Sequence, residues 1–418
     1  MSPDSLLELS DRDRACLDGD LGEGAALAMG LLVAIAETEG ATGFIDIEGA
    51  HIDGCLFHGQ VGIDFARALV EGGATVQVPT TLNVSSLDLL HPDLYRGSTD
   101  EGEAARQLMD LHVELGCAPT WTCAPYQLPD RPKLGSQVAW GESNAIVFAN
   151  SVLGARTNRY GDFADISCAV VGRAPLSGLH LDSGRRAEML VEVRIPQSAF
   201  AHEIVFPLLG NWLGVKTGNR VAAISGLPTD TTEDNLKALG AAAASSGSTA
   251  MFHAVGLTPE ASTLEECQAS PDIPRLRVEM IDLIEVRGAL GVGHDDPGAV
   301  SVGTPHMSAA ELRQLAILVG DGKSRIPFYV NTGRDVLSSV PGSVVAAIEA
   351  FGATVVTDTC TYITPIMGAV EGPVMTNSGK WAYYAPANLG FDVVFAGLEE
   401  CVKSAISGKI HLEDPFQM

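Results

Sequence analysis

Three cysteines stand in similar places, each in a loop that follows a segment typical of a β-strand. Cys55 follows GFIDIEGAHIDG, Cys123 lies in TWTCAPYQL, and Cys360 ends the stretch ATVVTDTC. Loops at the carboxyl ends of parallel strands gather at one edge of a sheet, so the three thiols could meet there. Thiolates are the usual protein ligands of iron–sulfur clusters. A cluster held by three of them leaves one iron able to act as a Lewis acid on a substrate oxygen.

A single scattered cysteine is more often a buried structural residue than a ligand. We interpret four further cysteines in that way, because they fall in helical, strand or loop patterns without ligand spacing: Cys16, Cys168, Cys267 and Cys401. Cys117 is close enough to Cys123 in the sequence to line the same site. No CxxC pair is present, which argues against a zinc finger or a thioredoxin-like motif.

Three histidines and a lysine add further candidates. His51 and His58 flank Cys55, and His306 directly precedes a predicted helix. Each histidine could be a metal ligand, a proton carrier or a packed side chain. Lys380 follows a Ser-Gly turn in TNSGKWAYYAP, but the GxxxxGK[ST] spacing of a phosphate loop is absent, so nucleotide binding is disfavoured.

The stretch WGESNAIVFANSVLGARTNRYGD surrounds an apolar, helix-like segment with polar groups. In an average segment such residues are helix caps and exposed loop positions. Arg156 and Arg159 nevertheless stand out in an acidic chain, because a guanidinium group can bind a carboxylate through two hydrogen bonds. The same stretch supplies a carboxylate, a hydroxyl and two amides as candidates: Glu142, Ser143, Asn144 and Asn158.

Helical and strand patterns alternate along the chain, which predicts an α/β fold of several subdomains with largely parallel sheets flanked by helices. Residues 22–40 carry the apolar spacing of a helix, whereas 74–83 and 353–362 are typical of strands. The short apolar run at 166–172 predicts a further strand, and this strand would contain Cys168.

The length and charge limit the class of protein. A chain of 418 residues predicts two or three subdomains, with breaks near 181–200 and 258–275. The net charge of −26 argues against nucleic acid or an anionic membrane as partner, because phosphate groups would be repelled. The sequence shows no signal peptide and no apolar stretch near the roughly 20 residues that span a bilayer, so a cytoplasmic location is expected.

Seven motifs in order carry a resemblance to a known family: HIDGCLFHG, TTLN, TCAPYQL, WGESNAIVFANSVLGARTNRYGD, GTPHMS, DTCTYITPI and TNSGKWAYY. The chain resembles the large catalytic portion of the aconitase X family over essentially its whole length, 1–418. The resemblance implies an aconitase-like fold and an iron–sulfur cluster. Two activities are described for the family: dehydration of cis-3-hydroxy-L-proline to Δ1-pyrroline-2-carboxylate, and dehydration of mevalonate 5-phosphate.

The positions of the cysteines favour the first of these activities. Cys123 and Cys360 match the family's TC-[AT]-PY and DTC motifs and would be cluster ligands. The mevalonate-phosphate type carries a cysteine in a GCPH motif, where this chain has Thr304 in GTPH. Cys55 stands instead in a DGC motif associated with the hydroxyproline type. The resemblance therefore implies a cluster held by these three cysteines and the hydroxyproline branch of the family.

The implied reaction eliminates water from a small-molecule substrate. A base removes the proton at C2, beside the substrate carboxylate, while an iron coordinates the departing C3 hydroxyl. The resulting enamine tautomerises to the cyclic imine. Glu142 and Lys380 are the candidates for proton transfer, and Arg159 is the candidate for binding the carboxylate. Hydrogen-bonding groups for the substrate would be Asn83, Ser143, Asn144 and Asn158.

The resemblance also implies a partner. Family members have a smaller swivelling domain, either fused or on a separate chain, and here we expect it as a small subunit. Three other functions stay open: a mevalonate 5-phosphate dehydratase large subunit, a mononuclear metal hydrolase that uses His51, His58 and acidic residues, and a non-catalytic scaffold subunit. A phosphate pocket would need a cationic cluster, and 26 Lys plus Arg against 52 Asp plus Glu offer no obvious one.

Overall fold

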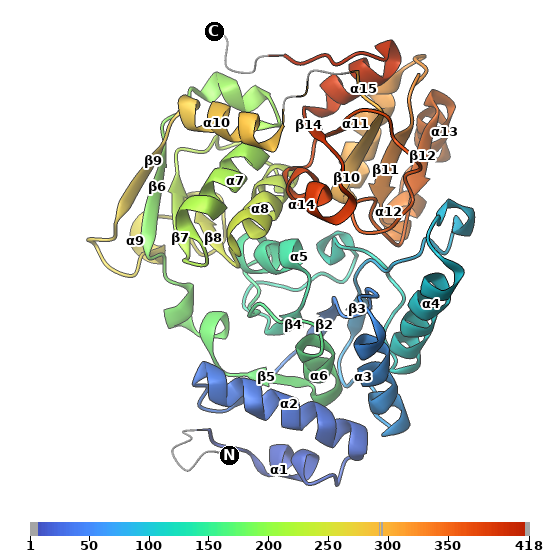
Figure 1. Cartoon of the computed structure of the whole chain (residues 1–418). Coiled ribbons are helices and arrows are strands. Elements are labelled where there is room, and N and C mark those ends of the chain that lie inside the picture. Colours follow the sequence, from blue (N-terminus) through green and yellow to red (C-terminus); the bar gives the residue numbers. More distant parts are fainter. Residues whose placement is uncertain (1–6, 292, 294–295, 414–418) are drawn as a thin grey trace.

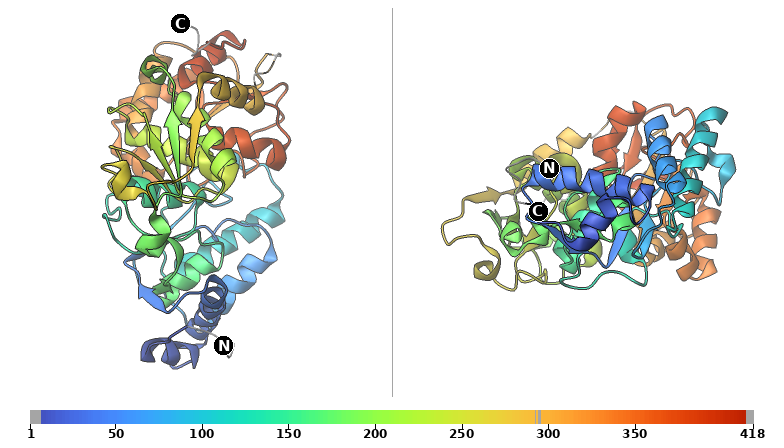
Figure 2. Two further views of the ribbon diagram at one scale, coloured as in Figure 1. Left: turned by 90° about the vertical axis from the view of Figure 1, so that its left-hand side faces the viewer. Right: turned by 90° about the horizontal axis from the view of Figure 1, so that it is seen from below.

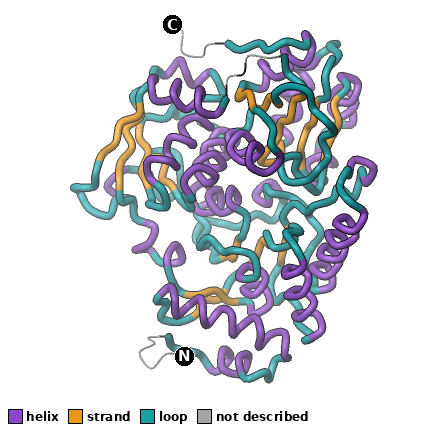
Figure 3. The backbone as a smooth tube through the Cα atoms, in the orientation of Figure 1, coloured by secondary structure: helices purple, strands orange, loops and turns teal. Residues whose placement is uncertain are grey.

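The computed structural model describes residues 7–291, 293 and 296–413, which form three regions that each contain a parallel sheet (Figure 1). The N-terminal helices lie at one end of the molecule and the last described residues at the other, as Figure 2 also shows from the side. Short strands alternate with helices and loops (Figure 3). The expected α/β class with largely parallel sheets is confirmed. Within the described chain, no helix combines the length and the apolar character needed to cross a membrane.

The first region, residues 7–185, holds a three-stranded parallel sheet and a separate antiparallel strand pair. Its strands are β1 (Phe44–Asp46), β2 (Gly49–Ile52), β3 (Thr80–Leu82), β4 (Val138–Trp140) and β5 (Arg173–Pro175). Its helices are α1 (Asp11–Leu17), α2 (Glu23–Glu39), α3 (Gln60–Glu71), α4 (Thr99–Glu114), α5 (Ser143–Phe148) and α6 (Ala164–Val171). The sheet has the order β3-β2-β4, and β1 pairs with β5.

The second region, residues 189–290, is built on a four-stranded parallel sheet of order β8-β7-β6-β9. Its strands are β6 (Met189–Val193), β7 (Ala222–Ser225), β8 (Phe252–Ala254) and β9 (Arg275–Val278). Its helices are α7 (Val205–Thr217), α8 (Glu233–Gly247), α9 (Leu264–Cys267) and α10 (Met280–Leu290). Every strand except the last is fully or nearly fully buried, which explains its continuous apolar sequence.

The third region begins at residue 299 and contains a five-stranded parallel sheet of order β12-β11-β10-β13-β14. Its strands are β10 (Ala299–Met307), β11 (Phe328–Thr332), β12 (Ala353–Val356), β13 (Val374–Thr376) and β14 (Val393–Phe395). Its helices are α11 (Ala309–Val319), α12 (Arg334–Ser339), α13 (Gly342–Phe351), α14 (Gly379–Leu389) and α15 (Leu398–Ser407). Ser308 caps α11, because its hydroxyl accepts a hydrogen bond from the backbone N–H of Glu311 at 3.1 Å.

A buried arginine fastens the first region to the second at the chain connection between them. Arg185 is 2% exposed, and its guanidinium donates to Glu260 at 2.9 Å and to both Asn150 Oδ1 and Asn150 O at 2.9 Å. This arginine lies inside the expected break at 181–200. The other expected break, 258–275, connects β8 to β9 within a single sheet.

One expected strand is wrong. Residues 166–172 form most of helix α6 and its glycine cap, so Cys168 is helical. All eight residues of α6 are buried, and a helix that is buried on every side carries no polar face. A short, uniformly apolar run therefore cannot be assigned to helix or strand from periodicity alone.

Helices α7 and α8 pack closely because glycines face the opposite helix backbone. A Cβ placed on Gly210 would lie 2.1 Å from the carbonyl oxygen of Leu239, and a Cβ on Gly247 would lie 1.9 Å from that of Gly214. Real Cβ atoms cannot approach backbone oxygens so closely. The spacing between the two helices therefore depends on the absence of side chains at these positions.

We expect Gly210→Ala to lower the free energy of unfolding by about 1–3 kcal/mol, because the helices must separate to admit the methyl group. Urea unfolding monitored by circular dichroism measures this change. Gly288→Ala is the matched control: Gly288 is exposed in α10 with no atom within 4 Å of an added Cβ. That substitution should be neutral or stabilise by up to about 1 kcal/mol through helix propensity. Equal stability of the two variants would contradict the packing argument.

Candidate active site

Two of the three expected thiols meet where loops of the first and third regions come together. Cys123 lies in the loop before a short turn at Pro125–Gln127, and Cys360 lies in the loop after β12. His306, on β10, completes the group. One ligand atom from each residue, the two Sγ atoms and a ring nitrogen, lies within 4.8 Å of the others, and all three side chains are buried.

Hydrogen bonds hold the group in place. The backbone N–H of His306 donates to Cys123 Sγ at 3.3 Å, and its ring contacts Thr122 Oγ1 at 3.1 Å and the carbonyl oxygen of Thr359 at 3.2 Å. Burial alone would raise the pKa of Cys123, but a hydrogen bond from the Cys360 thiol and the charge at His306 outweigh it and lower this pKa to about 6. Cys123 therefore favours the thiolate form, which is the form that binds a metal.

Cys55 is not a member of this group. Its buried thiol lies 3.4 Å from the carbonyl oxygens of both Ile52 and Asn83 and donates to them. Burial, together with the charge of Asp53, raises the pKa of Cys55 well above its ordinary value. The expected meeting of three thiols is therefore reduced to two thiols and an imidazole. His306 was left open by the sequence, although its place at the end of a strand in the GTPH motif was an available signal.

A buried ion pair joins the first and third regions beside this group. Lys380 Nζ donates to Glu142 Oε1, and both side chains are 4% exposed or less. The Glu142 carboxylate caps α5 by accepting from the backbone N–H of Ala145 at 2.8 Å. It also accepts from Ser143 Oγ at 3.0 Å and from Asn144 Nδ2. These four bonds use the roughly four acceptor positions of a carboxylate.

The pair is ionised. Burial would lower the pKa of Lys380, but the charge of Glu142 outweighs burial and holds it well above the ordinary value. Burial would raise the pKa of Glu142, and the charge of Lys380 with its hydrogen bond brings it below the ordinary value. Lys380 thus offers an ammonium group, placed 5.7 Å from the centre of the Tyr362 ring.

The residues expected to bind substrate lie in different surroundings. Asn144 ties the ion pair to the cysteine loop, since Nδ2 also donates to Cys123 O at 2.9 Å. Asn158 is engaged within the protein, donating to Ser177 Oγ at 3.0 Å and accepting from Leu179 N–H at 2.7 Å. Asn158 therefore orders the local loop.

The two arginines of the segment 140–162 differ in whether their guanidinium groups are free to bind an anion. Arg156 donates to Asp182 at 2.5 Å, so its guanidinium is already paired with a carboxylate. Arg159 is exposed and has no hydrogen bond or ion pair with the residues that the structure describes. It lies near enough to Tyr384 of α14, four residues after Lys380, for its charge to oppose the rise in pKa that burial causes at that phenol. Arg159 is the arginine that is free to meet an anion.

Three buried polar atoms around the site have no hydrogen-bond partner among the described residues: His51 Nε2, Asn83 Oδ1 and Thr304 Oγ1. Burial lowers the pKa of His51 to about 3, so this imidazole is neutral. Its Nδ1 contacts Thr81 Oγ1 at 2.8 Å. Buried polar groups almost always have partners, so unpartnered atoms on β2, on β10 and directly after β3 indicate a place where a ligand binds.

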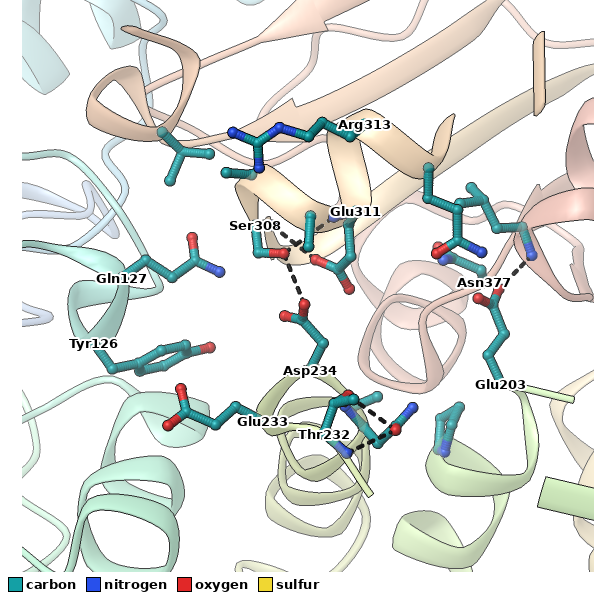
Figure 4. Close-up of a pocket in the computed structure, with 18 of the residues that line it drawn as sticks. Tyr126, Gln127, Glu203, Thr232, Glu233, Asp234, Ser308, Glu311, Arg313 and Asn377 are labelled. Carbon is teal, nitrogen blue, oxygen red and sulfur yellow. Dashed lines mark hydrogen bonds between the residues drawn. The ribbon is translucent and has the colours of Figure 1, made fainter. Parts of the chain in front are cut away.

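A large cavity among the described residues is separate from this group. It measures about 1310 Å³, and Figure 4 shows Tyr126 and Gln127 on one side, Glu203 and Asn377 on the other, and Asp234 bonded to Ser308 at 2.8 Å between them. No member of the thiol–imidazole group lines it. Its acidic lining residues are Glu203, Glu233, Asp234, Glu311, Asp335, Glu399, Glu400 and Glu413. Such a lining does not favour an anionic substrate, so the chemistry is assigned to the buried group.

We expect Glu142→Gln to lower the free energy of unfolding by about 3–5 kcal/mol, because it leaves the Lys380 ammonium buried without its counter-charge. Lys380→Met should destabilise similarly by leaving the Glu142 carboxylate unpaired. The double variant should lose less than the sum of the two single losses, since neither charge then remains. Urea unfolding of the four proteins measures this coupling. Strictly additive losses would show that the two side chains do not act as a pair.

Comparisons with known proteins agree with this architecture. Models of the aconitase X first, second and third domains match residues 6–183, 187–288 and 297–407. The chain is 41% identical to a cis-3-hydroxy-L-proline dehydratase of Pseudomonas aeruginosa and 39% identical to one of Hypocrea jecorina. Each alignment covers 98% of this chain, and 72% and 70% of those relatives respectively.

A second group of relatives is matched over nearly their full length. The phosphomevalonate dehydratase large subunit of Thermococcus kodakarensis is 35% identical, with 95% of this chain and 99% of that protein aligned. The crystal structure of Thermococcus kodakaraensis aconitase X in its holo-form superposes with a TM-score of 0.87 at 33% identity, covering 96% of this chain and 100% of that one. The three domain models and these relatives together show that the chain belongs to the aconitase X family of dehydratases.

Proposed function

We propose that the protein dehydrates cis-3-hydroxy-L-proline to Δ1-pyrroline-2-carboxylate. The observation that carries the proposal is the meeting of Cys123, His306 and Cys360 beside the buried ammonium of Lys380. Such a site combines metal ligands with a fixed cation, as elimination of water next to a carboxylate requires. The relatives at 41% and 39% identity, named for this activity, support the choice of substrate.

An iron–sulfur cluster is part of the proposal, and the donor set fits one. Cys123 and Cys360 are buried, within reach of one another, and one of them favours the thiolate form. Imidazole also ligates iron in some clusters of this kind. When bound, the cluster would supply an iron that acts as a Lewis acid toward the leaving hydroxyl group.

The third protein ligand has two candidates. His306 is favoured by position, since its ring lies within 4.8 Å of both thiols. Cys55 is favoured by chemistry, since a thiolate is the commoner cluster ligand. Either would have to give up a hydrogen bond: His306 to Thr359, or Cys55 to the backbone of β2.

The protein's own residues would bind and orient the substrate. Arg159 meets the carboxylate from the exposed side of the site, as its free guanidinium permits. Lys380 stabilises the negative charge that spreads onto this carboxylate when the C2 proton leaves. Glu142 has no acceptor position left for a further proton, so its role is to orient Lys380 and keep it protonated.

Two further parts of the proposal are a partner subunit and a cellular location. We include a small subunit with a swivelling domain as partner, because the chain aligns with 99% of a relative that is named a large subunit. We also include a cytoplasmic location. All eight cysteines are free thiols in the structure, and cluster thiolates need the reducing conditions of the cytosol.

Anaerobic purification, iron and sulfide analysis, and an assay for cyclic imine from cis-3-hydroxy-L-proline test the proposal. We expect iron, sulfide and product from the wild-type protein prepared with its small subunit. Cys123→Ser and Cys360→Ser should each lose most of the iron and reduce the product by at least about a hundredfold, as removal of a metal ligand or its support commonly does. Cys267→Ser, in a thiol far from the group, is the control and should keep both.

The same measurement assigns the third ligand. Loss of iron in His306→Ala with retention in Cys55→Ser would place the imidazole on the cluster, and the reverse result would place Cys55 there. Iron and sulfide without product would retain the cluster and refute hydroxyproline as substrate, and mevalonate 5-phosphate would then be assayed. A folded wild-type protein without iron would contradict the cluster.

A further inference from the structure

Four carboxylates lie close together beside the buried ion pair: Asp53, Glu142, Asp162 and Asp165. The backbone N–H of Asp53 donates to Asp165 Oδ2 at 2.6 Å, and Glu142 and Asp162 lie close enough to act on the charge of Asp53. Lys380 is the cation that acts on the same carboxylate. Lys380 is already paired with Glu142, so no ion pair among the described residues gives Asp53 a cation of its own.

A missing side chain allows this crowding. Gly141 immediately precedes Glu142, and a Cβ at this position would lie 2.5 Å from Asp165 Oδ2 and 3.0 Å from Asp53 Cβ. The loop that carries Asp53 and the segment that carries Glu142 therefore touch at Gly141. Asp53, which follows β2, and Glu142, which follows β4 in the same sheet, are thereby brought close together.

Asn83 adds an acceptor beside Asp53. It is 2% exposed, and its Nδ2 donates to Asp53 Oδ1. Its Oδ1 is buried and has no partner among the residues described. A buried amide oxygen without a donor costs free energy, so its place next to a carboxylate indicates a ligand that brings N–H groups.

We infer that Asp53 and Asn83 bind the ring ammonium of the substrate and so select a cyclic amino acid. This inference rests on the proposed function and deepens it. The secondary ammonium of a 3-hydroxyproline carries two N–H donors, one for the Asp53 carboxylate and one for Asn83 Oδ1. Mevalonate 5-phosphate has no ammonium group to offer to these two acceptors.

The position of the ammonium also serves the elimination. The ring nitrogen is bonded to C2, so a positive charge held there draws electrons from the C2–H bond and makes that proton easier to remove. Asp53 keeps the nitrogen protonated by pairing with it, and no covalent bond to the nitrogen forms or breaks in this step. Asp53 and Asn83 are therefore positioning and specificity residues, distinct from Lys380 and Arg159 at the carboxylate.

Two ligands that differ only at one ring atom test the inference. L-Proline carries the ammonium, and cyclopentanecarboxylate has a methylene group in its place. Their dissociation constants would be measured by calorimetry on the anaerobic protein with its small subunit. We expect the wild-type protein to bind L-proline at least tenfold more tightly, and Asp53→Asn to reduce this ratio by roughly ten- to a hundredfold, as for loss of a charged hydrogen-bond partner.

Two control variants and one further test variant accompany Asp53→Asn. Asp53→Glu keeps the charge and should retain most of the preference. Asn83→Ala should weaken it by a smaller factor, which provides a second test if Asp53→Asn does not fold. Asp64→Asn removes one carboxylate from an exposed position on α3 and should change neither dissociation constant.

The outcomes separate this inference from the proposed function. A folded Asp53→Asn protein that keeps the wild-type preference, with an unchanged KM for cis-3-hydroxy-L-proline, would overturn the inference and leave the proposed function intact. A wild-type protein that makes no cyclic imine and shows no preference for L-proline would overturn both. Loss of the preference with iron content unchanged would support the inference, since the cluster is then intact.

Discussion

The site depends on one buried ion pair between residues that are 238 positions apart in the chain. Removing two charges from water is costly, and a buried pair of this kind is weak evidence for added stability. Its value here is geometric. Glu142 begins α5 in the first region, Lys380 stands in the first turn of α14 in the third, and Asn144 joins the pair to the loop of Cys123. A shift between the two regions would separate all of these groups together.

Similar contacts fix the second region. Lys237 of α8 is 4% exposed and pairs with Asp234 at 2.9 Å and with Glu311 of α11, which links the second region to the third. Arg185 performs the same role between the first and second regions through Glu260. The three regions are thus joined by buried charges in specific geometry. Buried charges tolerate displacement poorly, because a separated pair leaves both partners without compensation.

The sequence predicted those features that follow from local pattern. The α/β class, the Ser308 helix cap and the placement of Cys360 after a strand all depend on short-range periodicity and turn residues. Cys123 was expected after a strand as well, but the residues before it follow α4 and form only an isolated bridge at Ala118. Features decided by distant partners could not be obtained in this way. Residues 166–172 form a helix because every side of it is covered, and periodicity carries no information in that case.

The same limit applies to the site. His306 joins the two thiols through backbone and ring contacts to loops of both regions, and no spacing along the chain encodes such a contact. Glu142 matched a proton-transfer role by residue type, but its carboxylate is saturated by four donors, one of them Lys380. The roles of ionisable residues depend on which neighbours use their lone pairs, and that is a property of the tertiary structure.

The division of the ligand group between two regions has a consequence for biosynthesis. Cys123 and His306 are 183 residues apart, and Cys360 follows still later. Cys123 leaves the ribosome long before β10, which carries His306, and β12, which precedes Cys360, have been synthesised. The group of Cys123, His306 and Cys360 is therefore complete only after translation has passed the third region and that region has docked on the first. During this interval Cys123 is an unprotected thiol, so the nascent chain is more sensitive to oxidants than the finished protein.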